Sequence, residues 1–350
     1  MWRPSGYFAT SYIEDIRLLR TRGQKLALVF GAIVLLVLPL ALSPTWTRFA
    51  TVAGITVVAV VGLQMLMGSA GQVSIGQAAF MGVGAYATAF FAIRGFPFPL
   101  PILLGAVCAT IVGALFGGPA ARIRGFYLAL TTLAAQYVFV FTVVRLPADW
   151  FGGVNGLSVP LPTFGGIDFF DTTNMYYLVL PFVVVMVAAA IFINAGKIGR
   201  DFIAVREDDN AAAVLGVNVA RTKIKAFGLS SFYAGIAGGL LAYQSGLAHF
   251  EQYQVNHSLW FIGMLIIGGM GSTLGAVLGT FLILFIEELL NNVAPQIAEL
   301  GILGKGDIVY PLVSVTVGLL VILVIIKQPR GLAHIYRTLE RKAHLWPFPQ

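Results

Sequence analysis

The sequence predicts an all-α integral membrane protein, a polytopic helical bundle of eight to ten spans. Three observations lead to this fold class. Of the 350 residues, 58% are hydrophobic and only 11% are charged, and the mean hydropathy is +0.87. Apolar runs of about 18 or more residues, long enough to cross a ~30 Å hydrocarbon core, recur along the chain. Most Lys and Arg residues lie in the loops on one side of these runs, as is typical of membrane proteins.

The expected spans follow one another along most of the chain. In order they are 26–44, 50–67, 78–94, 100–120, 126–146, 176–194, 223–247, 258–268, 273–290 and 308–327. Segment 258–268 is too short to cross as a straight helix, so the expected count runs from eight to ten.

The chain divides into three regions. Residues 1–25 form an amphipathic N-terminal segment, either an interfacial helix on the cytoplasmic leaflet or a partly ordered tail. Residues 26–327 form one membrane domain, which contains a charged loop at 195–225, and residues 328–350 form a C-terminal tail. Membrane lipid is therefore an expected partner over much of the surface.

Basic residues set the expected orientation. If the N-terminus is cytoplasmic, four inner loops hold 18 of the 22 Lys and Arg residues. These loops are 1–25, 121–125, 195–225 and 327–350. The outer loops hold only Arg48, Arg94, Arg145 and Lys305. The positive-inside rule then predicts that both termini are cytoplasmic and that the number of spans is even.

Glycine interrupts two apolar stretches, Met67–Gln77 and Ile267–Thr273. Irregular backbone in a bilayer is satisfied by protein or by cavity water, and broken helices in transporters commonly line the solute path. For the second break a tight turn between closely packed helices is at least as good an interpretation. For the first break we favour pathway lining over packing, because its side chains are too polar for lipid exposure. The candidate pathway residues are Gln64, Ser69, Gly71, Gln72, Ser74, Gly76 and Gln77.

Several kinds of chemistry lack residues to perform them. With these spans, every acidic and basic residue lies in a loop or near a span end, so no mid-membrane acid is placed for ion coupling. The sequence has no phosphate-binding loop for ATP and no repeated channel filter. We expect no catalytic residue, no metal site, no cofactor bound by this chain and no nucleic-acid partner.

A charged segment, Gly199–Gly216, separates the spans 176–194 and 223–247. Its Ala, Val, Arg and acidic residues predict one helix of about four turns over 200–215, and Gly216 is a natural helix end. Such a segment has to lie in water, either as a solvated loop helix without a function or as a contact with another protein.

Motifs in and around this segment resemble those of a known family. Asn210-Ala211-Ala212, with Gly216 four residues after Ala212, is similar to the EAA loop of bacterial ABC importer permeases, although Asn210 stands where Glu is usual and the later Leu-Pro is absent. The wider pattern resembles the permease family of branched-chain amino acid ABC importers, most closely the second, larger permease of the pair. It comprises Gly71–Gly76, Arg122–Ala129, Gly152–Gly156, Gly199–Asn218, Ala234–Gly238, Gly268–Ser272 and Gln328–Leu332.

The resemblance implies a permease subunit of a bacterial inner-membrane importer. Its implied partners are a second permease subunit, two cytoplasmic ABC ATPases that hydrolyse the ATP, and a periplasmic solute-binding protein. The chain itself is then not an enzyme, and the charged segment is a cytoplasmic coupling helix that docks on the ATPase. The implied coupling residues are Arg200, Arg206, Glu207, Asp208, Asn210, Ala211, Ala212 and Gly216.

The substrate stays open. Relatives in the same family import branched-chain amino acids, urea, short amides or aromatic acids. An ATP-independent secondary transporter and a membrane-bound enzyme or assembly subunit are the alternative classes, and the missing intramembrane acid and the missing catalytic cluster weigh against them respectively.

Overall fold

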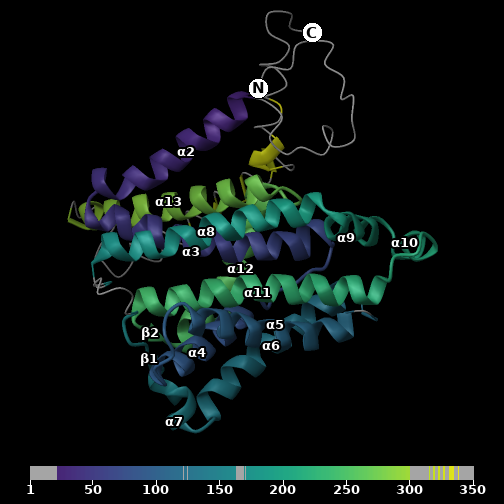
Figure 1. Cartoon of the computed structure of the whole chain (residues 1–350), viewed down its shortest axis with the longest axis horizontal. Helices are drawn as coiled ribbons and strands as arrows, with labels where there is room; N and C mark the ends of the chain where they lie inside the picture. The colour runs from purple at the N-terminus through teal and green to yellow at the C-terminus, as the bar shows by residue number, and fades with distance from the viewer. Residues whose placement is uncertain are drawn as a thin grey trace, which may run out of the picture.

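Long apolar helices that run side by side make up most of the computed structural model (Figure 1). The structure describes residues 22–120, 122–123, 125–162, 169 and 171–299, together with 315, 318–319, 322–323, 326–327, 331–334 and 338. The longer helices are α2 (Arg22–Ala41), α3 (Pro44–Leu63), α4 (Gln77–Ile93), α5 (Leu100–Ala120), α6 (Phe126–Arg145), α8 (Thr172–Ala195), α9 (Lys197–Glu207), α11 (Val219–Ser245), α12 (Val255–Gly268) and α13 (Thr273–Glu299). The shorter elements are the π-helical η1 (Gln64–Ser69), α7 (Ala148–Phe151), η2 (Gly153–Asn155), β1 (Leu157–Ser158), α10 (Asp209–Val214), β2 (Leu247–Ala248) and η3 (Phe250–Tyr253).

Six helices in the described part of the chain are long and apolar enough to cross a membrane. They are Pro44–Ser69, Leu100–Pro119, Phe126–Arg145, Thr172–Ala195, Val219–Ser245 and Thr273–Asn292. Three shorter apolar helices lie where the other spans up to residue 290 are expected, namely Val29–Ala41, Gln77–Ile93 and Val255–Gly268. The all-α membrane fold is confirmed. The count of eight to ten stays a prediction, because 308–327, like 1–21 and most of 328–350, lies largely outside the described residues.

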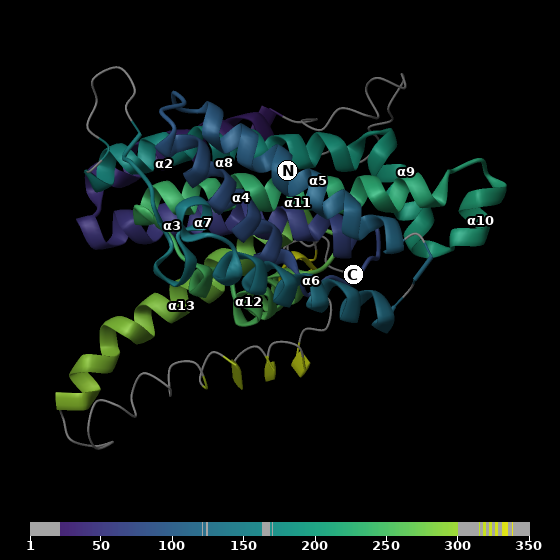
Figure 2. The ribbon, with the colours of Figure 1, turned by 90° about the horizontal axis from the view of Figure 1, so that it is seen from below.

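Helix α11 lies in the centre of the bundle against α3, α4 and α5 (Figures 1 and 2). Its apolar stretch is 72% buried, against 22% for that of α8 at the periphery. Glycine allows this central packing, because a Cβ atom on Gly84, Gly235 or Gly238 would overlap backbone atoms of a neighbouring helix. Small residues let membrane helices approach closely. The backbones of α4, α5 and α11 are therefore in direct contact at these points.

The two ends of the bundle differ, and we name them the ribbon end and the α9 end. At the ribbon end, β1 pairs antiparallel with β2, with Leu157 opposite Ala248. The His249 Nε2 atom lies 2.9 Å from the Val154 carbonyl oxygen. The long loop between α6 and α8 is thereby tied to the segment that follows α11. At the α9 end, α9 lies beside the start of α11 and α10 projects beyond the long helices (Figure 1).

Candidate functional site

Helix α9 lies against the bundle through its apolar face. Phe202 and Val205 are buried, and Phe202 belongs to a small apolar cluster with residues from the end of α3 and the start of α11. Gly199 lies so close to the Asn194 carbonyl group that a side chain there would overlap it. This contact brings the start of α9 against the last turn of α8. The position of α9 is therefore fixed relative to three longer helices.

The expectation of one continuous helix over 200–215 is wrong, because Asp208 divides the segment into α9 and α10. Asp208 has extended backbone angles, φ −159° and ψ 118°. Its Oδ1 atom accepts hydrogen bonds from the backbone N–H groups of Asn210 (2.7 Å) and Ala211 (3.0 Å). Aspartate at this position caps a new helix, since it satisfies N–H groups that have no partner in the first turn.

Helix α10 is held to α11 by a buried ion pair. The Lys223 Nζ atom lies 2.6 Å from Asp209 Oδ2, and the two side chains are 1% and 7% exposed. Neither residue was among the predicted coupling residues. They lie in different helices with the turn at Gly216 between them, so only the fold reveals the pair.

The first glycine break lies directly beside this segment. The last turn of α3 widens into η1, and Gly71 follows with a φ of +65°. A Cβ atom on Gly71 would lie 2.6 Å from Arg206 Cγ. Position 71 therefore requires glycine for two reasons: its backbone is left-handed, and a side chain would overlap Arg206.

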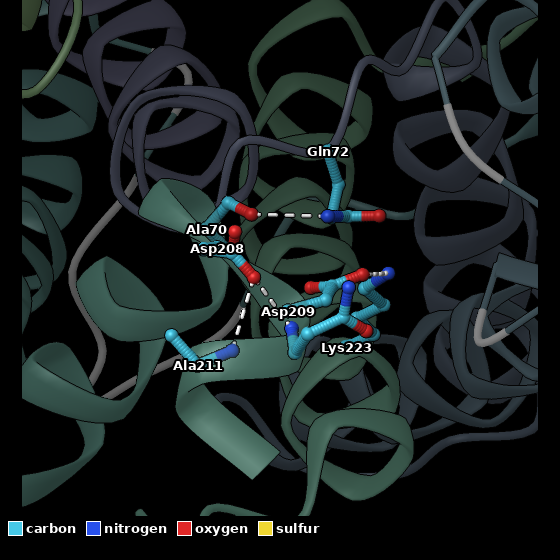
Figure 3. Close-up of polar contacts among 7 residues, drawn as sticks. Ala70, Gln72, Asp208, Asp209, Ala211 and Lys223 are labelled. Atoms are coloured by element: carbon cyan, nitrogen blue, oxygen red, sulfur yellow. Dashed lines mark hydrogen bonds and ion pairs between the residues drawn. The ribbon is translucent and has the colours of Figure 1, made fainter. Parts of the chain in front are cut away.

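A polar cavity of about 250 Å³ separates the glycine break from the charged segment. Gln72 extends toward Asp208, Asp209 and Lys223 from the opposite wall, and its Nε2 atom donates to the Ala70 carbonyl over 3.0 Å (Figure 3). The cavity is lined by Gly71, Gln72, Gly125, Val205, Arg206, Glu207, Asp208, Asp209, Asn210 and Lys223. Residues predicted for the pathway and residues predicted for coupling thus meet at one place.

The other pathway candidates are bonded inside the bundle. Gln77 is fully buried and donates to the Ala59 carbonyl over 3.0 Å, while the Ser230 hydroxyl donates to its Oε1 over 3.0 Å. Ser74 is buried, and its Oγ atom accepts from the N–H of Gly76. These three residues lie where α4 begins, farther from the charged segment than Gln72. Pathway lining stays a prediction for all seven candidates.

The coupling candidates face in different directions. Arg206 donates through Nη1 to the Gly68 carbonyl over 2.8 Å and pairs with Glu207. Ala212 is buried against the bundle. The other seven candidates are exposed, namely Arg200, Arg206, Glu207, Asp208, Asn210, Ala211 and Gly216.

The end of α10 carries an apolar tip that the sequence prediction did not single out. Val214 and Leu215 are 88% and 80% exposed, at the part of the chain that projects farthest from the helices (Figure 2). Gly216 follows with a φ of +86° and turns the chain back toward α11. Two adjacent apolar side chains on a projecting turn form a surface suited to a partner protein. A signal was present in the sequence, because Val-Leu directly before the helix-ending glycine interrupts a polar segment.

Apolar helices, glycine-packed at the centre and with a projecting charged segment at one end, define a multi-pass membrane protein of the permease class. Residues 45–326 match the family described as branched-chain amino acid transport system / permease component, and the chain belongs to this family of ABC importer permeases.

Individual relatives agree with this assignment. The chain is 29% identical to the high-affinity branched-chain amino acid transport system permease protein LivM of Escherichia coli K12, over 77% of this chain and 69% of that protein. It is 26% identical to a probable LivM of Methanocaldococcus jannaschii, over 55% of this chain and 56% of that protein. It is 31% identical to the autoinducer 2 import system permease protein LsrC of Klebsiella pneumoniae, over 40% of this chain and 42% of that protein. No solved structure matches the chain.

Proposed function

We propose that the chain is the larger permease of a two-permease ABC importer that moves branched-chain or related hydrophobic amino acids across a bacterial inner membrane. The observation that carries the proposal is the family match over residues 45–326. The identity with LivM of Escherichia coli supports the substrate class. In this role the chain forms half of a solute path and performs no covalent chemistry.

The charged segment is proposed as the coupling element. Val214 and Leu215 enter an apolar groove on an ABC ATPase, and the exposed residues around them make the surrounding contacts. These residues are Arg200, Arg206, Glu207, Asp208, Asn210, Ala211 and Gly216, with Ala212 holding α10 to the bundle. Because α9 is packed against η1, α8 and α11, movement of the tip reaches the membrane helices. The ATPases have to bind the two states of the path differently, or no shift between them follows.

The assembly follows from this role. A second permease completes the path, two cytoplasmic ATPases hydrolyse ATP, and a periplasmic solute-binding protein delivers solute at the ribbon end. The α9 end then faces the cytoplasm together with both termini, in agreement with the distribution of basic residues. This chain binds neither ATP nor another cofactor in the proposed cycle.

The test is reconstitution of the chain with the second permease, ATPase and binding protein encoded beside it. Uptake into proteoliposomes is measured with leucine, isoleucine and valine, and with urea, acetamide and benzoate as competing substrate classes. ATP-dependent uptake of the three amino acids supports the proposal. Uptake of only urea, an amide or an aromatic acid reassigns the substrate, and uptake by this chain alone without ATP overturns the importer role.

A further inference from the structure

Asn194 is the centre of a closed polar cluster at the α9 end. Its Nδ2 group donates to Gln64 Oε1 (3.3 Å) and to Thr273 Oγ1 (3.2 Å). Its Oδ1 atom accepts from the Ser69 hydroxyl (3.0 Å), and Gln64 Nε2 in turn donates to Ser69 Oγ (3.3 Å). Gln64 and Ser69 are 1% and 6% exposed. The cluster therefore joins η1, the end of α8 and the start of α13 through hydrogen bonds that are partly buried.

Arg206 makes a second tie to the same helix end. The Gly68 carbonyl belongs to the last turn of the α3–η1 helix, where carbonyl groups have no intrahelical N–H partner. Arg206 Nη1 donates to it over 2.8 Å. A guanidinium group at this end of a helix also interacts favourably with the helix dipole. Asn194 lies in the last turn of α8 and Arg206 in the last turn of α9, so the two ties lie on either side of α9 along the chain.

The backbone between these ties is already irregular. In η1 the backbone N–H of Ala70 bonds to the Met65 carbonyl (3.1 Å) and that of Gln72 to the Leu66 carbonyl (3.0 Å), which are wider turns than those of an α-helix. A Cβ atom on Gly68 would lie 2.6 Å from the backbone nitrogen of Gly271, so this segment also touches the second glycine break directly. Short π-helical segments are uncommon and occur often at functional sites.

We propose that Asn194 and Arg206 are positioning residues that hold the π-helical η1 and the start of α13 against the α8–α9 junction and α9, so that displacement of α9 moves both glycine breaks together. The inference rests on the proposed function and adds the route from the coupling segment to the membrane helices. Its physical basis is that every link is a direct contact: α9 to Gly68 through Arg206, Gly68 to Gly271 by backbone contact, and α8 to α3 and α13 through Asn194. A polar cluster in which every member is hydrogen-bonded is rigid, so displacement of one member moves the others.

The experiment measures solute uptake and ATP hydrolysis together in proteoliposomes that contain the complete importer. The variants are Asn194→Leu, Arg206→Gln, Arg206→Lys and the milder Thr273→Val. We expect Asn194→Leu and Arg206→Gln to assemble and to move roughly three- to thirtyfold less solute per ATP hydrolysed, the range typical of residues in a coupling network. Arg206→Lys should retain most of the wild-type ratio, because lysine keeps the charge and one donor for the Gly68 carbonyl.

Two matched controls separate coupling from general damage. Thr280→Val removes a buried hydroxyl that donates to the Ala276 carbonyl in its own helix, and Asn292→Ala removes an exposed amide that donates to Glu288. Both should keep the wild-type ratio.

The outcomes distinguish three cases. A wild-type ratio in assembled Asn194→Leu and Arg206→Gln overturns the inference while the proposed function stands. If Asn194→Leu fails to assemble, Thr273→Val and Arg206→Gln decide the question. If some variants fail to assemble and all the others transport the wild-type amount of solute per ATP, these residues give structural support only. Absence of ATP-driven uptake by the wild-type importer is a failure of the proposed function itself, because the wild-type control precedes any comparison between variants.

Discussion

At the residue scale, the buried pair of Lys223 and Asp209 determines how α10 is held. Both side chains are almost completely buried. Removing two charges from water is costly, and their attraction offsets that cost only while both are present. Loss of one partner is therefore worse than loss of both.

Replacing Asp209 with Ala should lower the free energy of unfolding by about 3–5 kcal/mol, because it leaves the Lys223 ammonium buried without its partner. The double variant Asp209→Leu/Lys223→Met should recover most of that loss, since a well-packed apolar pair often replaces a buried ion pair without cost. Unfolding of the detergent-solubilised proteins is followed by intrinsic fluorescence. An Asp209→Ala protein as stable as the wild type would contradict the prediction.

Gly216 allows a purely conformational test. Its φ is +86°, and a Cβ atom there would meet no heavy atom within 4 Å. Gly216→Val should therefore cost about 1–2 kcal/mol from backbone strain alone, and Gly216→Asn clearly less, because asparagine tolerates this region. The amount of ATPase recovered by pull-down should fall in the order glycine, asparagine, valine at position 216. Equal recovery by all three would remove this turn from the coupling mechanism.

At the element scale, α10 is a short helix whose apolar tip faces solvent. Val214 and Leu215 add nothing to the interior of this chain, so their side chains are available to a partner. Burying an apolar side chain of this size contributes on the order of 1.5–3 kcal/mol.

Replacing Val214 and Leu215 with Ser should leave the unfolding transition of the chain unchanged and weaken ATPase association by at least about tenfold, from the lost apolar burial. Val154→Ser is the matched control, because Val154 is an exposed valine at the ribbon end, 62% accessible. Association is measured by surface-immobilised binding of the ATPase to permease in nanodiscs. Undiminished binding by the double variant would place the ATPase contact elsewhere.

Elements of this segment also show where prediction from sequence ends. The positions of the long apolar helices up to residue 290 were predictable, because exclusion of charge from hydrocarbon leaves a long and simple signal. Their ends were less so, since α3 begins at Pro44 and not at residue 50. The division at Asp208 was not predicted, because the residues on both sides of it favour a helix and hide the capping tendency of the aspartate. Asn194 was taken only as the end of a span. Its role depends on Gln64 and Thr273, which are 130 and 79 positions away and are brought close only by folding.

At the scale of the whole molecule, orientation follows from charge. With Cys108 replaced by Ser, a cysteine at Asn210 should react with an impermeant maleimide only after the cells are opened. A cysteine at Val154, at the opposite end of the bundle, should react in intact cells. Both positions are exposed, so accessibility within the fold does not bias the comparison. The reverse pattern of labelling would invert the proposed topology.

The glycine contacts among α4, α5 and α11 restrict how this molecule changes shape. Packed side chains can shift between rotamers when two helices move, but backbones in direct contact have no such layer to rearrange. We therefore expect these three helices to move as one rigid body. Bending is expected where regular hydrogen bonding is already interrupted, at η1, at the junction at Asp208 and at the glycine turn before α13. Under the proposed function, alternating access in this subunit is then a hinge motion at the α9 end.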